Sequence, residues 1–186
     1  MKRVLRLRRL RATWLALLLA LATLWVQAQE LGTAREPAVK AAYLLNFTAF
    51  VEWPPAALDA QDAFVIGVYG DDAVAAELET LVVGRRVRGL PVVVRRAREV
   101  PTGERVHLAY LAARRESRVS EMTARLAGPV LVVTHLNDGL AAGAVLNFVL
   151  DNGRLRFEAS QRRAEQRDLR LSSRLLALAV TVEGRP

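Results

Sequence analysis

Along the first half of the chain, the spacing of apolar positions alternates between that of helices and that of strands. The first predicted helix covers residues 37–50, where apolar side chains recur every three or four positions and so share one face. They are Val39, Tyr43, Phe47 and Phe50. Trp53-Pro54-Pro55 ends this helix, because proline has no amide donor and disfavours helical backbone in the residue before it.

Short apolar runs rich in valine, isoleucine and leucine then predict buried strands. They cover residues 64–69, 90–94, 106–111 and 130–134. A helix with Val74, Leu78, Leu81 and Val82 on its inner face separates the first two runs, and Asp71 or Asp72 can cap it. A second helix opens at Ser117 and ends before Gly128-Pro129.

The pattern changes after residue 134. Two apolar runs, 145–150 and 154–159, flank Asp151-Asn152-Gly153, and an Asn-Gly pair favours a tight hairpin turn. The polar segment 160–167 is predicted to be helical, and Ser172 or Ser173 then caps a last apolar helix. The predicted fold is therefore α/β, a mainly parallel sheet flanked by helices with an antiparallel C-terminal hairpin.

The N-terminal 28 residues have a composition of their own. Six basic residues and no acid precede an apolar stretch over 14–26, and Val26-Gln27-Ala28 ends in small or short side chains. This layout predicts a cleaved signal peptide over residues 1–28 and a single exported domain over 29–186. The apolar stretch is shorter than the roughly twenty residues that span a bilayer. An uncleaved membrane anchor remains the alternative.

Export changes the meaning of the charge. The chain has 27 Lys and Arg against 19 Asp and Glu, and six of the bases fall in the signal, which leaves only +2 on the remainder. The basic character that suggests nucleic-acid binding thus belongs mostly to the discarded segment, and we expect no nucleic-acid partner. Cysteine is absent, so disulfides and thiol catalysis are excluded.

The residues offer little support for catalysis. A nucleophilic mechanism needs a base beside an activated hydroxyl, and His107 and His135 are the two histidines. His107 opens a predicted buried strand, and the two serines near residue 172 are better explained as caps. A zinc site needs three or four ligands, of which His135 and Asp138 supply two. We therefore expect no catalytic residue, metal or cofactor.

Polar residues follow several predicted strands at their carboxyl ends, where open α/β sheets bind ligands. They are Asp71 and Asp72, Arg114 and Arg115, and His135, Asn137 and Asp138. Such a mixed-charge rim could hold a small zwitterion, for example an amino acid. The ligand-binding candidates are Asp71, Arg114, His135 and Asp138. The alternative is that these residues only cap helices and form turns.

A second candidate surface lies on the predicted hairpin. Arg154, Arg156 and Glu158 alternate along its second strand and so share one face, and Arg174 follows on the last helix. These four residues, named here the hairpin surface, could complement an acidic partner domain. The alternative is an ordinary solvated strand in which charge prevents aggregation.

Several segments, taken in order, resemble the YfiR family of periplasmic proteins. The resemblance covers about 145 residues and rests on 41–47 (AAYLLNF), 50–54 (FVEWP), 67–72 (GVYGDD), 84–87 (GRRV), 107–111 (HLAYL), 147–148 (NF), 154–158 (RLRFE) and 171–179 (LSSRLLALA). It implies a small periplasmic α/β domain, often dimeric. It also implies a non-catalytic regulator that represses an inner-membrane diguanylate cyclase by binding its periplasmic sensor region, and so lowers cyclic di-GMP signalling.

The resemblance leaves the partner open, because other relatives are similar to accessories of sensor kinases or receptors. A periplasmic small-ligand sensor or carrier is therefore the alternative function. The chain also departs from the family pattern: Val106 replaces a common cysteine, Ala142-Gly143 a glycine pair, Ala159-Ser160 an Ile-Asn pair and Asp168 a usual glycine. These changes affect the expected partner surface more than the fold.

Overall fold

A computed structural model describes residues 36–59 and 61–184, and the predicted signal peptide lies outside this part of the chain. The helices cover residues 36–47, α2 (Pro55–Leu58), α3 (Asp72–Leu81), α4 (Glu116–Ala124), α5 (Gln161–Glu165) and α6 (Ser173–Leu178). The strands are β1 (Val51–Glu52), β2 (Phe64–Tyr69), β3 (Arg86–Val87), β4 (Leu90–Ala97), β5 (Leu108–Leu111), β6 (Leu131–Thr134), β7 (Leu146–Asp151), β8 (Arg154–Ser160), β9 (Arg170–Leu171) and β10 (Val182–Glu183).

Eight of these strands form one sheet in the order β10-β8-β7-β6-β5-β2-β4-β3. The strands from β7 through β6, β5 and β2 to β4 are parallel to their neighbours, and β8 runs antiparallel to β7. The mainly parallel sheet with an antiparallel C-terminal hairpin is thus confirmed. Asn152 and Gly153 at the hairpin turn both have positive φ, 49° and 72°, as an Asn-Gly turn requires.

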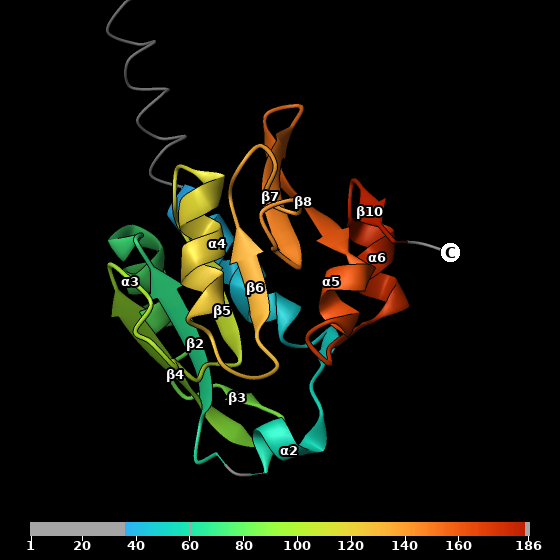
Figure 1. The fold of residues 1–186 in the computed structure, drawn as a ribbon. Coiled ribbons are helices and arrows are strands. Elements are labelled where there is room, and N and C mark those ends of the chain that lie inside the picture. Colours follow the sequence, from blue (N-terminus) through green and yellow to red (C-terminus); the bar gives the residue numbers. More distant parts are fainter. Residues whose placement is uncertain (1–35, 60, 185–186) are drawn as a thin grey trace, which may run out of the picture. The chain divides into compact units, whose positions relative to one another are not determined.

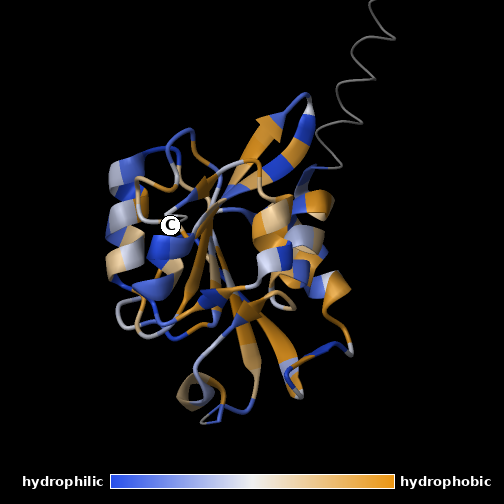
Figure 2. Cartoon of the chain, turned by 90° about the vertical axis from the view of Figure 1, so that its right-hand side faces the viewer, coloured by the Kyte–Doolittle hydropathy of each residue, from blue (hydrophilic) through white to orange (hydrophobic). Residues whose placement is uncertain are grey.

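Helices cover both faces of the sheet. Figure 1 shows α4 in front of the strands and the helix of residues 36–47 behind them. Leu44 and Phe47 of that rear helix join Val74 and Leu78 of α3 in the larger apolar cluster, whereas Val119 and Met122 of α4 pack in a second cluster on the other face. Figure 2 shows the same arrangement by hydropathy, with apolar strands lying between the helices.

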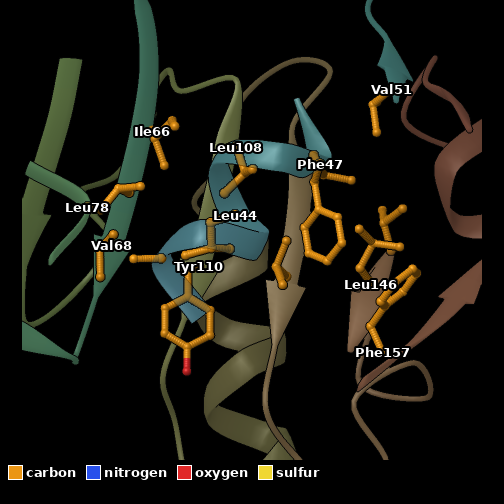
Figure 3. Close-up of a cluster of buried hydrophobic side chains, with 14 of the residues drawn as sticks. Leu44, Phe47, Val51, Ile66, Val68, Leu78, Leu108, Tyr110, Leu146 and Phe157 are labelled. Atoms are coloured by element: carbon orange, nitrogen blue, oxygen red, sulfur yellow. The ribbon is translucent and has the colours of Figure 1, made fainter. Parts of the chain in front are cut away.

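Aromatic rings fill the centre of the larger cluster. The Phe47 ring lies 5.0 Å from that of Phe157 and 5.8 Å from that of Phe148, centroid to centroid. Tyr110 reaches the same cluster from β5, with its ring 6.0 Å from Phe148. Figure 3 shows several of these side chains converging between helix and sheet. Such pairs add about 1 kcal/mol each beyond the area that they bury.

The first helix differs from its sequence-based prediction in two respects. It ends at residue 47, and Phe50 lies in a turn immediately before β1. The buried apolar residues of this helix are Ala41, Leu44 and Phe47, with Lys40 buried beside them, whereas Val39 is 40% exposed. The spacing therefore identified the helix and three residues that join or pack against the core cluster, Tyr43, Phe47 and Phe50, whereas Val39 lies outside it.

His107, just before β5, is a buried structural residue. Its Nδ1 accepts a hydrogen bond from the Val65 amide at 3.0 Å, so its Nε2 donates to the Ala57 carbonyl at 3.1 Å. Its backbone carbonyl accepts a hydrogen bond from the indole N–H of Trp53, which is also buried. Burial lowers the pKa of His107, despite these two backbone hydrogen bonds.

The buried imidazole makes stability depend on pH. Because the pKa is lower in the folded state, the unfolded chain takes up a proton first, so stability is lost as the pH falls through the ordinary histidine value of about 6.5. We expect His107→Asn, which retains an acceptor near the Nδ1 position, to reduce the loss of stability between pH 7.5 and 5.5. Urea unfolding at both pH values measures it, and identical pH dependence in the two proteins would refute this role.

Candidate functional site

A buried lysine and a histidine meet at the carboxyl end of β6. Lys40 is only 6% exposed, and its Nζ lies 2.8 Å from Nδ1 of His135. Since an ammonium group can only donate, Nδ1 accepts this hydrogen bond. The same ammonium group lies 5.9 Å from the ring centroid of Tyr110, within the range of a cation–π contact. The helix of residues 36–47 thereby fixes the histidine that follows β6.

Asn147 on β7 holds the backbone beside this pair. Its Oδ1 accepts hydrogen bonds from the Thr134 hydroxyl at 2.8 Å and the Leu136 amide at 3.0 Å. Its Nδ2 donates to the Leu136 carbonyl at 2.8 Å and to Oε2 of Glu158 at 3.1 Å. Both Asn147 and Thr134 are fully buried. One amide side chain therefore joins the loop after β6 to the hairpin.

Gly139 closes over this network and has no room for a side chain. A Cβ on Gly139 would lie 2.2 Å from Oδ1 of Asn147 and 2.4 Å from the hydroxyl of Thr134. Both distances are below van der Waals contact, and both atoms are held by hydrogen bonds. The need for glycine here comes from this close approach, because its φ is not in the left-handed region.

The structure brings two of the four ligand-binding candidates together. Arg114 and His135 line one hollow of about 470 Å³ together with Arg115, Glu116 and Asn137. Asp71 instead caps α3, with its carboxylate accepting from the Val74 amide at 3.0 Å. Asp138 is exposed and does not line that hollow. The hollow is therefore more basic than the mixed-charge rim expected from the sequence.

Three residues of the hairpin surface are every second residue of β8 and so share one face of the strand. Arg154, Arg156 and Glu158 lie opposite Asp151, Val149 and Asn147 of β7 in the register. Arg156 donates to the Leu178 carbonyl at the end of α6, at 3.2 Å, and lies 3.9 Å from the Asp151 carboxylate. Arg154 and Arg174 are exposed. Figure 2 shows that the turn end of this hairpin extends beyond the neighbouring helices.

The buried position of Lys40 was not predicted from the sequence, although the spacing of residues along its helix indicates it. It stands four positions before Leu44 and seven before Phe47, so it lies on the buried face of its helix. A lysine in an apolar stripe requires a buried polar partner, and that partner is 95 residues away. Thr134 and Gly139 carry no local signal, because their roles depend on contacts with β7.

Comparison with known proteins agrees with the family resemblance. Residues 37–180 match the YfiR/HmsC-like family. The chain belongs to this family, and the match includes β1 through α6 together with most of the first helix. A comparison with curated proteins found no match.

Three further findings concern the described part of the chain. No helix within residues 36–59 and 61–184 is both long and apolar enough to cross a membrane. The same residues contain no cluster of three or more His, Cys, Asp or Glu side chains suited to a metal ion. Asp168, where the family resemblance led us to expect glycine, has a positive φ of 56°, a backbone conformation that glycine adopts at less cost.

Proposed function

We propose that this protein is an exported, non-catalytic regulator that represses an inner-membrane signalling protein by binding its periplasmic sensor region. A diguanylate cyclase is the first candidate for this partner, and a sensor kinase is the second. The observation that carries the proposal is the family match, which covers residues 37–180. The N-terminal pattern of bases followed by a short apolar stretch supports export to the periplasm.

The proposed contact is the hairpin surface. Arg154 and Arg156 provide two cations on the strand that carries Glu158, and Arg174 adds a third on α6. Such a charged patch steers association with a partner of opposite charge. The base of the surface is rigid, because Asn147 ties Glu158 to the loop after β6. A preorganised surface binds with a smaller loss of side-chain entropy. A homodimer is compatible with this proposal, provided that it leaves the hairpin surface accessible.

The local chemistry supports binding without catalysis. His107 is engaged on both ring nitrogens inside the core. The hydroxyl of Ser172 caps α6 by accepting from the Leu175 amide at 3.2 Å. Neither group has the arrangement of a nucleophile next to a base.

Deleting the gene tests the proposal through the cellular level of cyclic di-GMP. We expect the level to rise in the deletion strain and to return to normal with the full-length chain. A chain that starts at Gln29, without the export signal, should fail to restore it although it is produced in equal amount. An unchanged level in the deletion strain, or full restoration by the unexported chain, would contradict the proposal.

A further inference from the structure

A second hollow, of about 460 Å³, lies at the amino ends of the strands, whereas Arg114 and His135 lie at the carboxyl ends. Its lining includes Gly128-Pro129 before β6 and Gly143 before β7, and these two strands are parallel. The hollow therefore lies where the strands begin, away from the carboxyl ends that the sequence singled out. Thr123 at the end of α4 and Arg163 and Arg167 around α5 complete its polar lining.

Two polar atoms of this lining are buried without a hydrogen-bond partner among the described residues. They are Nε of Arg163 and the hydroxyl oxygen of Thr123. The other end of the Arg163 guanidinium donates from Nη1 to Gln166 at 3.4 Å. A buried donor without a partner costs about 1–3 kcal/mol, so two of them at one hollow point to an acceptor that binds there.

The hollow is positively charged, which favours an acceptor that carries negative charge. Within the described part of the chain, no ion pair joins Arg163 or Arg167 to an acid, although Asp168 also lines the hollow. Burial, and secondly the positive charge of Arg163, lower the pKa of Arg167. Two guanidinium groups that repel each other across a partly buried hollow are stabilised by an anion between them.

We propose that this hollow binds a compact oxyanion, either a phosphate ion or the phosphate group of a small organic molecule. Guanidinium groups present paired N–H donors that match phosphate oxygens, and the Thr123 hydroxyl adds a neutral donor. The volume lies within the range of small-ligand sites, about 300–1,000 Å³. This site is independent of the hairpin surface and of the proposed regulatory function.

Calorimetric titration of the purified protein with sodium phosphate and with glycerol phosphate tests the site, with sodium chloride at equal ionic strength as reference. We expect saturable binding of a phosphate probe, at least tenfold weaker in Arg163→Gln and in Arg167→Gln. Thr123→Val, which keeps the side-chain shape, should weaken it less. Arg98→Gln is the matched control, because Arg98 is exposed and does not line the hollow, and should bind as the wild type does.

The two probes distinguish the source of the anion. Tighter binding of glycerol phosphate indicates an organic phosphate, and equal or weaker binding indicates the free ion. A stability measurement separates ligand binding from a structural role: without phosphate, Arg167→Gln should unfold at the same or a higher urea concentration, and only the wild type should gain stability when phosphate is added. No saturable binding, or equal weakening in Arg98→Gln, would overturn the proposal.

Discussion

Replacing Asn147 with alanine is expected to lower the free energy of unfolding by about 3 kcal/mol. The substitution removes four hydrogen bonds at once and leaves the backbone N–H and C=O of Leu136 without partners. The Asn147 side chain is itself fully buried, so the substitution leaves a cavity in place of the amide. The same change should release His135 from its position at the end of β6.

Urea unfolding of the wild type and of Asn147→Ala measures this effect. Asn137→Ala is the matched control, because Asn137 is exposed in the same loop and should change stability by less than about 0.5 kcal/mol. Equal stability of the two variants would show that the network around Asn147 adds nothing to the fold. A loss in Asn147→Ala with no change in the His135 ring resonances would contradict its role in positioning the histidine.

The parts of the fold that local patterns encode were predicted correctly. The strands 64–69 and 130–134 are continuous apolar runs, and the structure buries every residue of β2 and β6. The hairpin follows from Asn152-Gly153, because that pair accepts the positive φ that the turn requires. In each case the signal lies within about ten residues of sequence.

The parts that depend on distant contacts were not predicted. Strands β1 and β9 are two residues each and pair Val51 with Leu171, which no local pattern can indicate. The buried polar network likewise depends on Lys40 meeting His135 and on Asn147 meeting Leu136. Asp71 shows the converse, since an aspartate after a strand suits both a helix cap and a ligand site, and only the structure shows the cap.

Reversing two charges on the hairpin surface is expected to weaken partner binding by more than 100-fold. In Arg154→Glu/Arg156→Glu, two cations that face an acidic partner become anions, and like-charge contacts across an interface cost several kcal/mol. The fold should tolerate the change. The side chains of Arg156 and Asp151 are 41% and 45% exposed, and an exposed ion pair of this kind adds at most about 1 kcal/mol to the free energy of unfolding.

A double variant at the other edge of the sheet controls for net charge. Arg85 and Arg98 are exposed next to β3 and β4, at the opposite end of the strand order from β8. Arg85→Glu/Arg98→Glu therefore makes the same change in charge without altering the hairpin surface. We expect this control to bind the partner with an affinity close to that of the wild type.

Photo-crosslinking in living cells tests most directly whether the protein acts by contact with a membrane protein. A photoreactive residue in place of Val149, which lies opposite Arg156 in the register and so on the same face as the hairpin surface, should form a covalent adduct with an inner-membrane protein that has a periplasmic region. The adduct should persist in Arg85→Glu/Arg98→Glu and disappear in Arg154→Glu/Arg156→Glu. If no membrane protein is captured above background, or if both double variants give the same yield, the account is wrong.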